Sequence, residues 1–278
     1  MNVRAVWNRG INGQGINVLI RDSGLFPNHE DLGQIHERSS GLGPDHGTAS
    51  AGIVMARNNG IGMLGVAFNV NARSYNNFEV GMSQVIMDAH PGSVLTMSLG
   101  SASANISLPM LHDRHRWDQL GRLVSAGVVV VIGAGNGGVD LRNSSFQDYG
   151  NNGVILAGAC HPATGRRVPF SNFNLRNFVN SWGTNVATCG YGDLFGAGNV
   201  NRTYTNAYSG TSAATPLVAG VLALIQSHAR RVYQTIFNNW QMLSIIEQTG
   251  YREGVVDMIG TRPNAEAAIA FVDRLLER

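Results

Sequence analysis

The chain has little charge and no long apolar run. Acidic and basic residues make up 14% of its 278 residues, against about 25% in an average soluble domain, and the formal net charge is only +2. A balance so close to neutral gives no electrostatic reason to bind nucleic acid or an anionic membrane. No stretch reaches the roughly 18 consecutive apolar residues that a membrane-spanning helix needs. We therefore expect neither nucleic acid nor a membrane as a partner.

Cysteine is also scarce, which excludes a small domain held together by several disulfides. The two cysteines, Cys160 and Cys189, either form one disulfide or remain two buried thiols. Their positions in the sequence do not decide between these alternatives.

Apolar residues are plentiful instead, at 44% of the chain, and they are enough for the core of one large domain. Four apolar runs are continuous rather than alternating, which is typical of strands buried on both faces of a parallel sheet: residues 16–20, 93–97, 128–132 and 154–157. Helical patterns lie between and after them: residues 46–56, 79–89, 108–125, 212–231, 240–248 and 265–276. We predict an α/β fold with a doubly wound, mostly parallel β-sheet and helices on both faces, in one domain over residues 1–278.

Three polar residues stand at the ends of these predicted elements. Asp22 follows the first strand, His46 opens a helix, and Ser212 opens the most apolar helix. A serine hydroxyl becomes a good nucleophile when a neutral histidine can take its proton, and a buried carboxylate orients that histidine. The order Asp, His, Ser along the chain is one of the orders in which such a triad occurs.

A serine nucleophile also needs donors for the oxyanion that its attack creates. Asn136 closely follows the strand at 128–132, so the side chain is expected at the edge of the sheet where ligands bind. The backbone N–H of Ser212, at a helix start, is the second predicted donor.

Five short motifs carry a resemblance to the subtilisin-like serine proteases, from about residue 17 to residue 224. Three of them match the triad motifs of that family in order: Asp22-Ser23-Gly24, His46-Gly47-Thr48 and Gly210-Thr211-Ser212-Ala213-Ala214-Thr215-Pro216. Gly135-Asn136-Gly137 resembles the segment with the oxyanion asparagine. Ser98-Leu99-Gly100 resembles the substrate-binding strand, whose backbone pairs with an extended peptide.

The resemblance implies a serine endopeptidase that forms an acyl-enzyme on Ser212, with His46 as general base and Asp22 orienting the base. Two alternatives stay open. A transpeptidase or macrocyclase would use the same triad under a lid, for which only residues 101–117 and 139–152 have any length. A pseudoprotease would bind peptides without cutting them, although no triad member is missing.

Substrate preference is expected to depend on the wall formed by Gly133, Ala134 and Gly135, which is small and apolar. Gly137 stands where some relatives have an acidic residue, and Asp140 follows three positions later. An apolar or aromatic side chain before the scissile bond is therefore favoured.

The segment 133–138 also satisfies the glycine pattern of a dinucleotide-binding loop. That pattern requires an apolar helix directly after it and an acidic residue about twenty positions later. A polar stretch follows instead, and the expected acidic position falls within the next predicted strand. We therefore reject a nucleotide site.

Catalysis of this kind needs no cofactor, but the resemblance extends to a structural calcium loop. The residues at matching positions are Asp31, Arg57, Asn59, Ile61 and Met63. Carboxylate, amide and carbonyl oxygens suit Ca²⁺. Only one carboxylate is present among them, so a glycine-rich turn without metal is an equal alternative.

The expected partner is a peptide or protein substrate, and we expect a monomer. The resemblance implies a secretory leader and an inhibitory pro-segment, neither of which lies within these residues. It favours a secreted or otherwise extracytoplasmic protein. Residues 1–10 lack the apolar core of a signal peptide, so a cytoplasmic location stays open.

Overall fold

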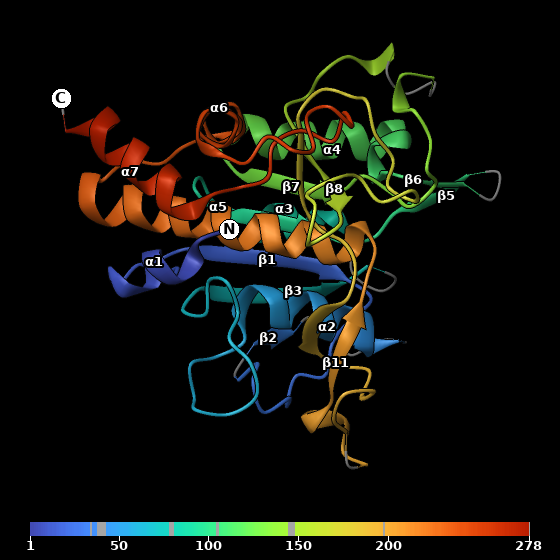
Figure 1. Ribbon diagram of the computed structural model, residues 1–278, viewed down its shortest axis with the longest axis vertical. Helices are drawn as coiled ribbons and strands as arrows, with labels where there is room; N and C mark the ends of the chain where they lie inside the picture. The colour runs from blue at the N-terminus through green and yellow to red at the C-terminus, as the bar shows by residue number, and fades with distance from the viewer. Residues whose placement is uncertain are drawn as a thin grey trace.

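A seven-stranded parallel sheet forms the centre of the computed structural model, which describes residues 1–33, 35–37, 43–77, 81–103, 106–143, 148–196 and 198–277 (Figure 1). The strand order is β2-β3-β1-β4-β7-β8-β9. The bounds of its strands are β1 Asn17–Asp22, β2 His36–Glu37, β3 Asn71–Asn76, β4 Val94–Met97, β7 Val129–Gly133, β8 Ile155–Cys160 and β9 Phe178–Trp182. This arrangement confirms the predicted α/β class.

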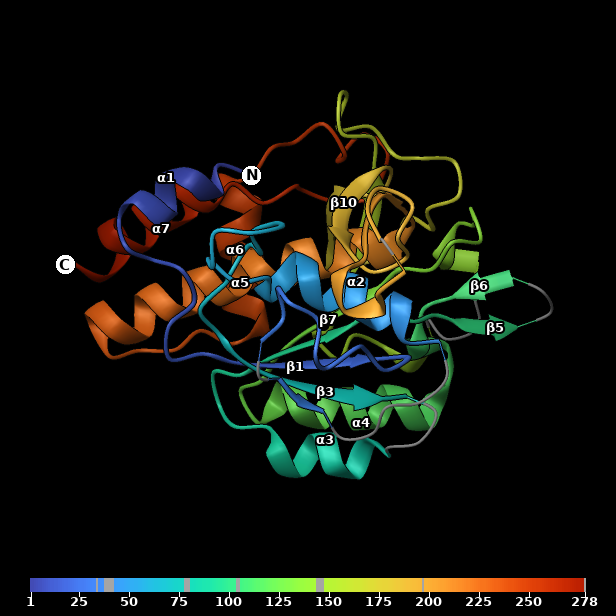
Figure 2. The ribbon, with the colours of Figure 1, turned by 90° about the horizontal axis from the view of Figure 1, so that it is seen from below.

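Helices cover both faces of the sheet (Figure 2). One face is covered by α3 (Met82–Asp88) and α4 (Arg114–Ser125). The other face carries α2 (Pro44–Met55) and α5 (Thr211–Tyr233), whose apolar side chains share one core cluster with the facing residues of the sheet. Three further helices lie on that side: α7 (Ala265–Leu276) packs on α5, and α1 (Val3–Asn8) and α6 (Asn239–Thr249) pack on α7.

Two small antiparallel pairs lie outside the central sheet. One is β5 (Ser101–Ser103) with β6 (Ile106–Leu108), and the other is β10 (Val186–Cys189) with β11 (Tyr204–Tyr208). β10 packs against α2, and β11 leads directly into α5. The second pair therefore joins the two helices on which His46 and Ser212 were predicted.

The predicted elements are present, with shifted boundaries. The helix predicted over residues 108–125 is the clearest correction, because Leu108 ends β6 and the α-helix begins only at Arg114. Between them lie Pro109, which cannot supply a backbone N–H, and one turn of 3₁₀-helix. The helix predicted at 79–89 begins at Met82, and residues 79 and 80 lie outside the described part of the chain.

Helix α5 is the one helix in the described part of the chain that is long and apolar enough to span a membrane. Its most apolar window is 94% buried inside the protein. Its hydrophobic character is therefore explained by its position between the sheet and the outer helices.

Candidate active site

Three neighbouring strands end at the same edge of the sheet and bring the predicted site residues together. Asp22 is the last residue of β1, Ser98 follows β4, and Asn136 lies three residues after β7. Because β1, β4 and β7 are adjacent and parallel, these residues share the carboxyl edge of the sheet. Ligands bind at this edge in open α/β sheets.

His46 reaches Asp22 because α2 packs unusually close to the loop after β1. Gly47 has no side chain, and a Cβ built there would lie 1.8 Å from the Gly24 carbonyl oxygen. The contact brings His46 Nδ1 to 2.5 Å from Asp22 Oδ1. Asp22 is buried and His46 is partly exposed, so the imidazole is anchored on its inner side and open on the other.

The environment of His46 acts on its pKa in two opposite directions. Burial lowers the pKa, while the charge of Asp22 and the hydrogen bond to it raise it, and the net result is a raised pKa. Because Nδ1–H donates to Asp22, the lone pair of a neutral imidazole is on Nε2. The free lone pair of a neutral His46 therefore lies on the side of the ring that faces away from Asp22.

Ser212 is the second residue of α5, two positions after a glycine whose backbone conformation few other residues adopt. Gly210 has φ of +104°, and a Cβ there would lie 3.2 Å from the side-chain nitrogen of Asn136. The Ser212 hydroxyl donates to the Ser98 carbonyl oxygen at 2.9 Å. Within the described part of the chain, Ser212 and His46 are not hydrogen-bonded to each other, although both lie beside the Tyr208 hydroxyl.

Tyr208 supplies the hydrogen bond to His46 Nε2, at 3.3 Å. Its hydroxyl is also 2.9 Å from that of Ser50, and its ring meets the imidazole edge to face at 5.5 Å between centroids. Neither Tyr208 nor Ser50 was predicted from the sequence. A signal was present, because His46 and Ser50 are four residues apart on one helix and therefore share a face.

Asn136 is held in place by the residue before the serine. Its side-chain oxygen accepts from the backbone N–H of Thr211 at 2.9 Å and from the Thr211 hydroxyl at 3.0 Å. The amide nitrogen is left to face the start of α5. The backbone N–H of Ser212 belongs to the first turn of that helix, whose N–H groups have no partner within the helix.

The wall at Gly133, Ala134 and Gly135 is fixed by Asn172, a buried residue that was not predicted from the sequence. Its amide nitrogen donates to the carbonyl oxygens of Ala134 and Ser107, each at 2.8 Å. Its oxygen accepts from the backbone N–H groups of Gly137 and Val139, each at 3.0 Å. One side chain thus ties the wall to β6.

The negative charge of Asp140, at the far end of this segment, is already paired with a positive charge. Its carboxylate forms an ion pair with Arg142 at 3.0 Å and accepts from the Asn174 side chain at 2.8 Å. Hydrogen bonding to Arg142 lowers the pKa of Asp140.

The described residues that follow the segment 133–138, up to β8, include 3₁₀-helical turns at Leu141–Asn143 and at residues 148–149, and no α-helix. This agrees with the rejection of a nucleotide site, which requires a helix there.

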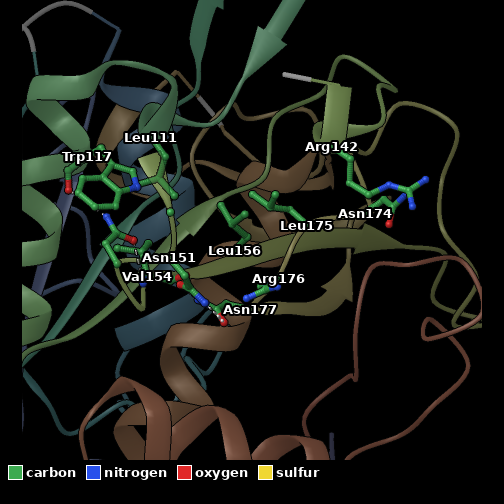
Figure 3. A pocket seen from close by; sticks show the side chains of 12 residues that line it. Leu111, Trp117, Arg142, Asn151, Val154, Leu156, Asn174, Leu175, Arg176 and Asn177 are labelled. Carbon is green, nitrogen blue, oxygen red and sulfur yellow. Dashed lines mark hydrogen bonds between the residues drawn. The ribbon is translucent and has the colours of Figure 1, made fainter. Parts of the chain in front are cut away.

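Two cavities differ in their relation to the predicted site. A hollow of about 280 Å³ lies beside His46, with Tyr191, Asp193 and Tyr208 among its lining residues. A cavity of about 580 Å³ lies between α4, β8 and the segment before β9, lined by Trp117, Asn177 and other polar and apolar side chains (Figure 3). None of the predicted catalytic residues lines the larger of these two cavities, so that cavity is not the predicted catalytic site.

The residues of the predicted calcium loop lie together. The Arg57 N–H donates to the Asp31 carbonyl at 2.9 Å, and the Met63 N–H donates to Asp31 Oδ2 at 2.8 Å. The Tyr204 hydroxyl donates to the same carboxylate oxygen at 3.1 Å. Oδ1 of Asp31 is buried and has no hydrogen-bond partner among the described residues.

The other side-chain oxygen of this loop is engaged. Asn59 Oδ1 accepts from the Ile61 N–H at 3.2 Å. No cluster of three or more His, Cys, Asp or Glu side chains occurs in the part of the chain that the structure covers. A cation at this loop would therefore be held by one carboxylate with amide and carbonyl oxygens.

Both cysteines are buried thiols, which decides between the two alternatives. Burial raises the pKa of Cys160 to about 11 and raises the pKa of Cys189 further. A thiol that stays protonated is a poor nucleophile.

A parallel α/β domain with a histidine–carboxylate pair beside a serine at a helix start has the architecture of a serine endopeptidase. A family model described as the subtilase family matches residues 13–260. The chain therefore belongs to the subtilase family.

Relatives of known name support this assignment. The thermostable alkaline protease of Halalkalibacterium halodurans is 31% identical over 281 aligned residues, which cover 94% of this chain and 69% of that protein. Subtilisin E of Bacillus subtilis is 29% identical over 243 residues, covering 80% of this chain and 58% of that protein. A solved protease structure from Pseudoalteromonas arctica shares the fold, with a TM-score of 0.73 and 24% identity over 98% of this chain and 94% of that one.

Proposed function

We propose that the protein hydrolyses peptide bonds through an acyl-enzyme on Ser212, with His46 as general base and Asp22 orienting His46. The single observation that carries the proposal is the 2.5 Å contact between Asp22 and His46 beside the start of α5. His46 Nε2 accepts the proton of Ser212 as the hydroxyl attacks, and later returns it to the leaving amine. The Asn136 amide nitrogen and the Ser212 N–H stabilise the oxyanion.

Substrate binding fits the resting hydrogen bond of Ser212. An extended peptide that pairs with residues 98–100 offers its own N–H groups to the carbonyl oxygens there. Such a peptide competes with Ser212 for the Ser98 carbonyl, which now accepts the serine proton at 2.9 Å. Release from Ser98 frees the hydroxyl to turn to His46. The nucleophile is thereby activated where a substrate is bound.

We expect Ser212→Ala to abolish labelling by a fluorophosphonate and to reduce peptide hydrolysis by a factor on the order of 10⁴ or more. The control is Ser83→Ala, a serine on α3 at the opposite face of the sheet, which should be labelled like the wild type. Absence of labelling in the wild-type protein would favour the peptide-binding pseudoprotease. Joined rather than hydrolysed peptides among the products would favour the transpeptidase.

The raised pKa of His46 predicts the acid side of the pH profile. The base must be neutral, and a pKa above its usual value of 6.5 means that protonation already begins at higher pH. Hydrolysis, measured as kcat/KM, should therefore fall about tenfold per pH unit below a midpoint above 6.5. A flat profile down to about pH 5 contradicts His46 as the base.

We propose that an apolar or aromatic side chain precedes the scissile bond. Gly133, Ala134 and Gly135 leave a small apolar wall, and Asp140 is occupied by Arg142. No free carboxylate of this segment therefore selects a basic side chain. Chromogenic peptides that vary only this residue should be cut fastest with leucine or phenylalanine. A clear preference for arginine would overturn the proposal.

We propose that the loop at Asp31 binds one calcium ion. Its support is the buried Asp31 Oδ1, which lacks a hydrogen-bond partner among the described residues and lies against the loop of residues 57–63. The carbonyl oxygens of Arg57, Ile61 and Met63 and the Asn59 amide would complete the ligands. One carboxylate gives a weak site, because ligand charge sets affinity.

We expect millimolar calcium to raise the melting temperature and a chelator to lower it, by about 2–4 °C for a gain of about 1 kcal/mol. Asp31→Asn should remove this dependence, while Asp118→Asn, on the exposed side of α4, should keep it. A wild-type melting temperature that is the same with calcium and with chelator would show that the loop is a turn without metal.

A further inference from the structure

Tyr208 is hydrogen-bonded to His46, one of the proposed catalytic residues, although the proposed reaction gives Tyr208 no role. It is the last residue of β11, four positions before Ser212, and its side chain is only 5% exposed. Its hydroxyl is 3.3 Å from His46 Nε2 and 2.9 Å from the Ser50 hydroxyl. Burial raises the pKa of Tyr208 well above its usual value, so the hydroxyl keeps its proton at any working pH.

The directions of these hydrogen bonds follow from His46. Nδ1–H donates to Asp22, so neutral Nε2 can only accept. The Tyr208 hydroxyl must then be the donor, which leaves its oxygen to accept from Ser50. A donor on Nε2 stabilises the neutral imidazole, whereas Asp22 stabilises the charged one. The two contacts act on His46 in opposite senses.

The Ser212 side chain also lies within hydrogen-bond reach of the Tyr208 hydroxyl, but it donates its own proton elsewhere. Its proton is held by the Ser98 carbonyl at 2.9 Å, so the position on Nε2 that the proposed reaction requires for the serine is occupied by Tyr208. Resting on the proposed function, we infer that Tyr208 is a positioning residue that, steadied by Ser50, donates to Nε2 of His46 and keeps it in its neutral, proton-accepting form until Ser212 takes its place.

Other groups around His46 do not fill this role. Asp22 faces it from β1, and Tyr191 and Asp193 line the adjoining hollow from the segment between β10 and β11. On α2 itself, Asp45 accepts from the Tyr191 backbone N–H at 2.7 Å. The carboxylates at this site favour the protonated imidazole. The donation from Tyr208 opposes them.

Tyr208→Phe tests the inference, because it removes the hydroxyl and keeps the ring against His46. Loss of one hydrogen bond to the neutral base should move the midpoint of the acid limb in the pH profile of kcat/KM to higher pH, by roughly 0.5 to 1 pH unit. At high pH, where His46 is neutral in either protein, the plateau should stay within about threefold of wild type. A merely structural role would lower the plateau and leave the limb in place.

Ser50→Ala provides the second arm, because Ser50 acts on His46 only through Tyr208. It should move the limb in the same direction by a smaller amount, and the double variant should equal Tyr208→Phe alone. The matched control is Tyr233→Phe, which removes a hydroxyl bonded to Asp273 at the far end of α5. This control should leave the limb unchanged.

An NMR titration of His46 in the Ser212→Ala background measures the same shift without turnover. This separates failure of the inference from failure of the proposed function, which fluorophosphonate labelling of the wild type tests. An acid limb and a His46 titration that are unchanged, or shifted downward, in both Tyr208→Phe and Ser50→Ala would overturn the inference. Should Tyr208→Phe not fold, as judged by its melting temperature, Ser50→Ala alone decides.

Discussion

The close approach of helix α2 to the loop after β1 is the constraint on which the site depends. At Gly47 the helix backbone lies where any side chain would collide with the Gly24 carbonyl oxygen. This contact fixes how far His46 extends toward the end of the sheet, and so whether its imidazole meets Asp22. The edge-to-face ring of Tyr208 and the start of α5 then pack around an imidazole whose position is already set.

The fold was predictable where burial and sequence pattern coincide. Continuous apolar runs predicted β1, β4, β7 and β8, because a strand covered on both faces has no polar side. Strands such as β9 were not predicted, because polar residues interrupt their apolar pattern. β9 contains Asn180 within its buried run, and its side chain is accommodated by donating to the Gly260 carbonyl at 2.7 Å. A pattern based on hydrophobicity cannot anticipate a partner eighty positions away.

The same distinction runs through the site. Asp22, His46, Ser212 and Asn136 stand in short motifs at element ends, so local sequence sufficed to select them. Tyr208 and Asn172 act through contacts with residues far away in the chain, 162 positions in the case of Tyr208 and His46. No motif surrounds Asn172, and Tyr208 stands two residues before the serine motif without being part of it. Only the contacts of Tyr208 with His46 and Ser50 on α2, and of Asn172 with Ser107 on β6, bring these two side chains to the site.

The two cysteines have a consequence for how the domain holds together. Cys189 is packed against Gly52 of α2, and a Cβ on that glycine would lie 2.8 Å from the sulfur. Both thiols act as small apolar side chains, and no disulfide joins them. Cohesion between α2 and β10 is therefore entirely noncovalent. A reductant therefore has no cross-link between these two elements to break, and they are held together by the packing of buried side chains alone.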